Sequence, residues 1–292
     1  MLIIGVNDMN DTNDTFLIKE YKIAGFMISN NYNQNYQIFP RMIRNYYNFD
    51  YLPAVQPLYT VRESRPKGKL RCLEFIVAPL CGAVDGINEA GLSITNNYAY
   101  ATDGTQLAPT LSMLVTEALS RCRTVPQAAE FLAKSKRWGG GILMLGDSDG
   151  RIASLELSST RSSLRHPAKN EDRLFHTNRY QQEQMTQIEI HDSALYSQRA
   201  PRALRDKRVH QSSDVRDERL QVRLATVGRL EPNRLLELMS DHGPDDAPSA
   251  DTICMHSDYW YTTACLQLCP KQRQMRIAYD TACRARFVDF EL

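Results

Sequence analysis

The chain has 292 residues, of which 42% are hydrophobic and 24% charged, and its formal net charge at pH 7 is +1. This near-neutral charge gives no field to recruit nucleic acid or an acidic membrane, and no stretch approaches the 18 apolar residues of a membrane-spanning helix. Since no basic segment precedes the short apolar run at the N-terminus, we expect a cytoplasmic protein whose thiols stay reduced.

A β-hairpin is predicted over residues 16–49. Residues 16–29 are apolar and β-prone, NNYNQN (residues 30–35) is typical of a turn, and residues 36–49 read as the returning strand. The next apolar run, residues 73–98, predicts two strands joined by turns at Asp85-Gly86 and at Glu89-Ala90-Gly91.

Helical spacing of leucine, valine and alanine predicts a helix over residues 110–120, and a second over 125–134 with Thr124 as N-cap and Gln127 at the capping-box position. We expect these two helices to pair antiparallel on one outer face. A hairpin with a tight turn at residues 147–150 follows.

The remainder predicts a helical stretch over residues 212–242, with an N-cap at Ser212 or Ser213 and a break at Pro232. Two strands follow, in residues 262–270 and 274–280. Strands on both sides of a central helical block, without an internal repeat or a linker, predict one layered α+β domain over residues 1–292.

The spacing of cysteine and histidine residues predicts no metal site and no cofactor. The seven cysteines include no Cys-X-X-Cys pair, their odd number argues against a disulfide framework, and the six histidines are scattered.

Four segments in order carry a family resemblance. They are Arg44-Asn45 with the following YNFD, DGINEAGLSITNN (85–97), LFHTN (174–178), and ADTICMH followed by TTA (250–264). Together they resemble the penicillin acyltransferases, bile-salt hydrolases and acid ceramidase-like amidases, which are linear amide C–N hydrolases of the N-terminal-nucleophile (Ntn) hydrolase superfamily. The resemblance covers residues 22–290.

The resemblance implies a four-layer α-β-β-α sandwich of two antiparallel sheets. It also implies acyl transfer from a linear amide through an acyl-enzyme, after self-cleavage makes the nucleophile the first residue. Its α-amine then accepts the proton, because the pKa of such an amine lies near working pH. The expected partner is a small-molecule amide or acyl substrate, and residues 1–25 are expected to be a pro-segment or an extra strand. A homo-oligomer is left open.

The resemblance gives Arg44 the role of binding the substrate or holding the nucleophile, and it gives Asn97 the role of oxyanion donor. Asn97 lies nine residues after Asn88, the first asparagine of the NEAGL motif, as in the family; Asn96 is the rival. A neutral amide donor stabilises a developing oxyanion without a change of its own charge.

The second catalytic asparagine is assigned to Asn178, with the neighbouring His176 expected to be structural. Arg216 matches an arginine at the start of a helix in the family, and Arg219 competes with it one turn later.

The family nucleophile, usually a cysteine after glycine, is missing. No cysteine precedes Cys72, and the hairpin count sets Gly25-Phe26 opposite Arg44, where the family has Gly-Cys. Ser29 is the nearby hydroxyl and our candidate nucleophile. Cys72 and Cys81 are expected to be small core residues.

A second departure concerns the segment after Arg44, where one residue is inserted and Asn48 replaces a carboxylate, with Asp50 as the substitute. Three hypotheses therefore stay open. The first is an active amide hydrolase or acyltransferase. The second is an inactive relative that binds a small molecule, has Phe26 in the nucleophile's place and does not self-cleave, and the third is an unrelated α+β protein whose motifs match by chance. In the second case Phe26→Cys with Asn48→Asp should restore chemistry.

Overall fold

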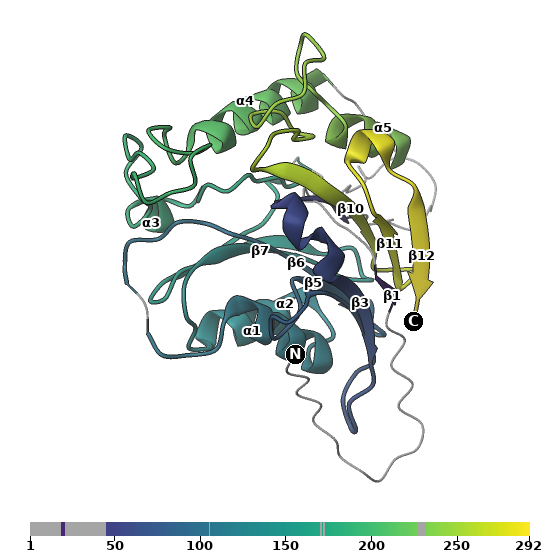
Figure 1. The fold of residues 1–292 in the computed structure, drawn as a ribbon. Helices are drawn as coiled ribbons and strands as arrows, with labels where there is room; N and C mark the ends of the chain where they lie inside the picture. The colour runs from purple at the N-terminus through teal and green to yellow at the C-terminus, as the bar shows by residue number, and fades with distance from the viewer. Residues whose placement is uncertain (1–18, 21–44, 105, 170, 172, 227–231) are drawn as a thin grey trace.

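The computed structural model describes residues 19–20, 45–104, 106–169, 171, 173–226 and 232–292 (Figure 1). The first half of the chain forms β1 (Lys19–Glu20), β2 (Asn45–Tyr51), a 3-10 helix η1 (Pro53–Leu58), β3 (Tyr59–Ser64), β4 (Cys72–Val77), β5 (Asp85–Asn88), β6 (Ser93–Asn97), α1 (Leu111–Arg121) and α2 (Val125–Lys134). The second half forms β7 (Gly141–Gly146), β8 (Ile152–Leu157), β9 (Ser162–Arg165), α3 (Glu183–Thr186), α4 (Gln211–Thr226), α5 (Pro232–Met239), β10 (Tyr261–Cys269), β11 (Gln274–Ala278), η2 (Ala282–Arg284) and β12 (Phe287–Glu291).

The described strands form two sheets, and every pairing between them is antiparallel. The larger sheet has the order β1-β3-β4-β5-β6-β7-β8-β9, and the smaller has the order β12-β11-β10-β2. Helices α1 and α2 cover the outer face of the larger sheet, and α4 and α5 lie beyond the smaller one (Figure 1). The predicted four-layer α-β-β-α sandwich is therefore confirmed.

Three apolar cores separate the four layers. The first packs Val115, Leu119 and Leu132 of α1 and α2 against the larger sheet. The second lies between the sheets, where Phe75 of β4 belongs to the same cluster as Leu266 of β10. The third joins α4 and α5 to the smaller sheet. Each fully buried leucine or phenylalanine stabilises the fold by about 2 kcal/mol, so the layers are held chiefly by burial.

The predicted helices α1 and α2 are found within one residue of their expected bounds, and both pack on the same sheet. The start of α2 differs in detail. Thr124 makes no side-chain cap, and the Val125 N–H instead donates to the Asp147 carboxylate at 2.9 Å. Gln127 does reach back, accepting from the Arg123 N–H at 2.8 Å.

Several expected elements are corrected by the structure. The run at residues 73–98 forms three strands, and Asp85-Gly86 lies inside β5 rather than in a turn. Gly86 is needed there because a Cβ would lie 2.5 Å from Leu119 of α1. The turn at residues 89–91 is confirmed; Gly91 has a φ of +82°, and its missing Cβ leaves room for the Pro270 carbonyl.

The expected hairpin over residues 16–49 is wrong where it is described. β1 pairs with β3 in the larger sheet, whereas β2 pairs with β10 in the smaller one, so β1 and β2 are not partners. Residues 21–44 lie outside the described ranges. β12, which the sequence did not indicate, pairs with β11 at the edge of the smaller sheet.

The helical stretch at residues 212–242 is two helices, and α5 starts at Pro232 as expected. The expected cap at Ser212 or Ser213 is wrong, because α4 already begins at Gln211. Ser212 instead donates its hydroxyl to the Ala250 carbonyl at 2.7 Å. None of the helices in the described ranges is both long and apolar enough to cross a membrane.

Candidate functional site

Asn97 and Asn178, which are far apart in the sequence, lie in direct contact. The Asn178 amide donates to the Asn97 side-chain oxygen at 2.8 Å and to the Tyr98 carbonyl at 2.9 Å, and Asn97 donates to the Thr177 carbonyl at 3.0 Å. Both asparagines are half-buried. Neighbouring residues of a strand project to opposite faces, which is why Asn97, and not Asn96, meets Asn178.

Arg216 completes this group from the second turn of α4. Its Nη2 donates to the Asn178 side-chain oxygen at 3.0 Å, and its Nε donates to the Ser212 carbonyl at 3.1 Å. The side chain is only 5% exposed. Arg219, the rival, pairs instead with Asp241 at a more exposed position. Three of the five residues singled out from the sequence therefore converge.

Asp50 of β2 faces Arg216. Its Oδ2 lies 3.8 Å from Arg216 Nη1, and its Oδ1 accepts a hydrogen bond from the Thr262 hydroxyl at 2.5 Å. Burial raises the pKa of the Asp50 carboxyl from 3.8 to about 7, although Arg216 and Thr262 oppose the shift. Burial likewise lowers the pKa of the Arg216 guanidinium, against the effect of Asp50. A carboxyl with a pKa near neutrality is suited to exchange protons.

A β-bulge shapes the strand pair that carries Asp50. The register between β2 and β10 shifts between Thr262 and Cys265, so β10 has one residue more than β2 in this interval. Bulges re-aim side chains and are common next to active sites. Here the extra residue lies in the TTA segment, where Thr263 donates to the Phe49 carbonyl at 2.9 Å.

Asn48 has a different place from the one expected. It is buried, and its amide donates to the Met239 and Ile253 carbonyls, both at 2.9 Å. A carboxylate there would face two carbonyl oxygens and would have no donor to offer them. Asn48 therefore holds the smaller sheet to the α5 layer, and Asp50 is the acidic group that reaches Arg216.

His176 is buried. Burial lowers the pKa of the imidazole to about 4, so the ring is neutral, and Nδ1 lies 2.8 Å from the Thr177 carbonyl. A carbonyl only accepts, so the Nδ1 atom carries the proton. The ring therefore gives no acceptor at Nδ1 to Asn97, 3.5 Å away, and one N–H of the Asn97 amide stays available as far as the described residues show.

Arg179 aligns the loop of Asn178 with α4. Its guanidinium pairs with Glu189 at 2.9 Å, Asp192 at 2.7 Å and Asp214 at 2.6 Å. Because Asp214 belongs to α4, this network sets Asn178 and Arg216 on facing elements. The planar fork of arginine is suited to bridge several carboxylates.

Arg44, Phe26 and Ser29 lie outside the described residues. Cys72 is buried in the core as expected, but Cys81 is exposed, because it lies in the connection from β4 to β5. An apolar groove of about 390 Å³ is lined by α2, β8 and β9, away from Asn97 and Asn178.

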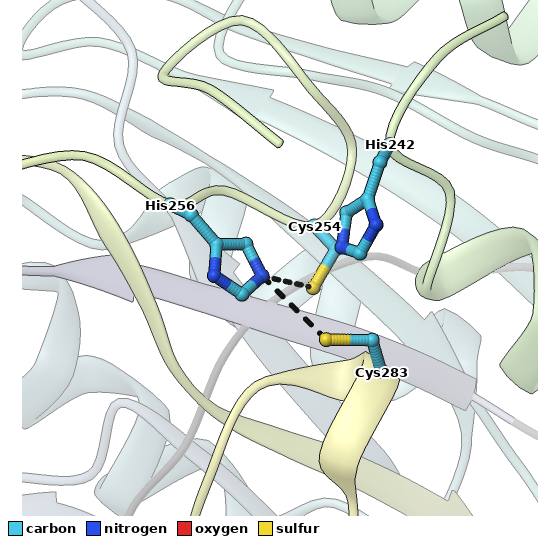
Figure 2. A group of neighbouring side chains, drawn as sticks. All are labelled: His242, Cys254, His256 and Cys283. Carbon is cyan, nitrogen blue, oxygen red and sulfur yellow. Dashed lines mark hydrogen bonds between the residues drawn. The ribbon is translucent and has the colours of Figure 1, made fainter. Parts of the chain in front are cut away.

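A second group of side chains was not indicated by the sequence. His242, Cys254, His256 and Cys283 direct their nitrogen and sulfur atoms toward one another, all within 4.8 Å (Figure 2). Spacing along the sequence does not indicate this group, because the fold unites residues separated by up to 41 positions.

Comparisons with known proteins match this chain to one protein family. The family described as acyl-coenzyme A:6-aminopenicillanic acid acyl-transferase matches residues 41–275, a segment that includes Arg44, Asn97, Asn178 and Arg216 but not Ser29. None of the curated protein sequences compared with the chain matches it.

Among solved structures, an N-acylethanolamine-hydrolyzing acid amidase (NAAA) ortholog from Caenorhabditis elegans superposes with a TM-score of 0.52 at 12% identity, covering 91% of this chain and 99% of its own. Penicillin V acylase from Agrobacterium tumefaciens has a TM-score of 0.44 at 11% identity, over 93% and 85%. Conjugated bile acid hydrolase from Clostridium perfringens has a TM-score of 0.41 at 11% identity, over 95% and 93%.

Proposed function

Because the chain belongs to the acyl-coenzyme A:6-aminopenicillanic acid acyl-transferase family, we propose that it cleaves linear amide C–N bonds through an acyl-enzyme intermediate. Water or an amine then accepts the acyl group. The observation that carries this proposal is the group Asn97, Asn178, Arg216 and Asp50, which combines amide donors, a buried guanidinium and a carboxyl with a pKa near 7.

In the proposed reaction Ser29, made the first residue by self-cleavage, attacks the substrate carbonyl carbon with its hydroxyl oxygen. The hydroxyl proton passes to the α-amine of Ser29, and the carbonyl oxygen gains negative charge. The free N–H of Asn97 donates to this oxygen, and such a preorganised donor is typically worth about 3 kcal/mol of transition-state stabilisation. The C–N bond then breaks, and the leaving amine takes the proton from the α-amine.

Arg216 and Asp50 support these steps by charge. The Asn178 oxygen already accepts from Arg216, so the guanidinium fixes the orientation of the Asn178 amide beside Asn97. An ionised Asp50 would stabilise an ammonium at the nucleophile's amine. Arg44, in the matched segment, is proposed to bind the substrate by its fork of donors.

The surface beside this group supports a proposal for the substrate class. Tyr98, whose carbonyl accepts from Asn178, is 59% exposed and packs edge-on against Tyr100 with ring centroids 4.8 Å apart. This aromatic surface is suited to an apolar or aromatic acyl group. The solved relatives act on acyl ethanolamides, penicillin V and conjugated bile acids. We propose a small-molecule amide of this kind and a cytoplasmic setting.

One observation favours a second function. Residues 1–71 contain no cysteine, although the family nucleophile is usually one. The alternative is therefore a protein that binds an amide or acyl compound without cleaving it, with Phe26 in the nucleophile's place.

The test is a panel of N-acyl amides with aliphatic and aromatic acyl groups, incubated with the full chain while released amine is measured. The proposal expects release by the wild type and loss of release in Ser29→Ala and Asn178→Ala. Gln221→Ala changes an exposed side chain of α4 that donates to Asp217 and does not touch the group; it is the control and should keep the activity. Binding without any amine release by the wild type would favour the alternative.

A further inference from the structure

Four side chains that bind metals well gather at the outer side of the smaller sheet. His242 follows α5, Cys254 and His256 lie in the loop that leads into β10, and Cys283 belongs to η2 between β11 and β12 (Figure 2). Their ligand atoms all lie within 4.8 Å of one another. Cys254 is buried and Cys283 is exposed, so one ligand is held inside the fold and another can be reached from solvent.

The distances fit tetrahedral coordination. A zinc ion with Zn–S near 2.3 Å and Zn–N near 2.0 Å places its ligand atoms about 3.3–3.8 Å apart. His256 Nε2 lies 3.5 Å from the sulfur of Cys254 and 3.5 Å from the sulfur of Cys283, within that range. No two of the four ligand atoms are more than 4.8 Å apart, which exceeds a tetrahedral edge by about 1 Å. Binding of the ion would require side-chain rotations that close this difference.

His242 is oriented as metal-bound histidines are. Its Nδ1 lies 3.0 Å from the Asp246 carboxylate, which favours a proton on Nδ1 and a lone pair on Nε2. That Nε2 atom is buried and has no hydrogen-bond partner among the described residues. A buried nitrogen without a partner costs free energy, and a cation at the centre of the group would satisfy it.

We propose that His242, Cys254, His256 and Cys283 bind one Zn²⁺ ion. All four coordination positions are filled by protein side chains, which is typical of a structural rather than a catalytic zinc site. Two thiolates and two imidazoles favour zinc over magnesium or calcium, which prefer oxygen ligands.

The proposed ion links segments that hold the candidate functional site. Cys254 follows Ile253, whose carbonyl accepts from Asn48, and Met255 donates its N–H to the Thr262 hydroxyl at 2.8 Å. The same hydroxyl donates to Asp50. Zinc at this place would therefore fix the loop that supports the Asp50 carboxyl, without touching Asp50 itself.

The experiment is the metal content of the full chain, purified under reducing conditions, stripped with a chelator, reloaded with Zn²⁺ and desalted. We expect one zinc per wild-type chain. Cys283→Ser and His242→Ala should retain no zinc above background. Cys81→Ser replaces a cysteine that is also exposed but lies outside the group, and should retain zinc like the wild type.

Co²⁺ gives a second readout that needs no activity. Tetrahedral cobalt with thiolate ligands shows intense visible bands and a near-ultraviolet charge-transfer band, and Cys283→Ser should weaken both. Stripping the wild type should lower its thermal unfolding midpoint by several degrees, with no such effect in Cys283→Ser.

Three results would overturn the proposal. One is a wild-type chain that holds only background zinc after reloading while its thiols stay free. Another is a Cys254–Cys283 disulfide, seen as a mass lower by two hydrogens in protein purified without reductant, combined with no zinc uptake after reduction. Zinc retained by both ligand variants would also exclude these residues as ligands.

Discussion

Replacing Arg216 by methionine tests whether the buried pair of Arg216 and Asp50 holds the candidate site. Removing one partner of a buried ion pair costs about 3–5 kcal/mol, because the other charge is left without compensation. The Asp50 carboxyl has a pKa near 7 and can take up a proton instead. We therefore expect the lower end, about 3 kcal/mol at pH 6, where Asp50 is mostly protonated.

The cost of Arg216→Met should depend on pH, because Asp50 titrates near neutrality. Arg216 lowers the pKa of Asp50, so the variant has a higher pKa than the wild type. A folded-state pKa above the unfolded value gives stability that is lost as pH rises through the folded pKa. In the wild type the free energy of unfolding stops falling near pH 7, the folded-state pKa of Asp50. In the variant, whose Asp50 has a higher pKa, the free energy of unfolding continues to fall above pH 7 by about 1.4 kcal/mol per pH unit. The cost of Arg216→Met should therefore be about 1 kcal/mol larger at pH 8 than at pH 6.

The assay is urea unfolding at pH 6 and pH 8. Arg219→Met is the matched control on the same helix, and its more exposed pair with Asp241 should cost about 1 kcal/mol at both pH values. Adding Asp50→Asn to Arg216→Met should abolish the pH dependence of the cost. If Arg216→Met costs no more than Arg219→Met at either pH, the reasoning about the buried pair is refuted.

Three further predictions concern buried polar side chains. The Asn88 side chain donates to the Leu119 and Cys122 carbonyls, both at 2.7 Å, and accepts hydrogen bonds from two backbone N–H groups. Asn88→Ala should therefore lower the free energy of unfolding, measured in urea, by about 3 kcal/mol. A loss below about 1 kcal/mol would contradict this role. The pKa of His176 is about 4 in the folded state and 6.5 in the unfolded state. The difference in unfolding free energy between the wild type and His176→Gln should therefore be fully present above pH 6.5 and should fall by roughly 3 kcal/mol as the pH is lowered to 4. A difference that does not change with pH would exclude a neutral buried ring. Asn48→Asp should lower the thermal midpoint, because it removes both donors to backbone carbonyls, whereas an unchanged or higher midpoint would show that the position tolerates a carboxylate.

The layered fold was predictable because most of its elements carry local patterns. The apolar spacing of α1 and α2 and the tight turn between β7 and β8 were read directly from the sequence. The strand β5 was misread, because Asp85-Gly86 is a common hairpin pair. In the structure Gly86 serves the close approach of Leu119, and such a contact between distant residues leaves no local pattern.

The candidate site was predicted in part for the same reason. Motif positions identified Asn97, Asn178 and Arg216, which the fold brings into hydrogen-bond contact. The exchange of roles between Asn48 and Asp50 depends on which carbonyls and donors face each side chain, and this is decided by packing. The group around His256 could not be read from spacing, since its members come from three separate segments.

The central claim is that the chain forms an acyl-enzyme. It is tested most directly by the mass of the full-length protein and its peptides after brief reaction with an activated acyl donor and acid quenching. We predict a mass increase equal to one acyl group, located in a peptide that begins at Ser29. An unprocessed chain that starts at Met1 and carries no acyl group, while it still binds the donor, would contradict the claim.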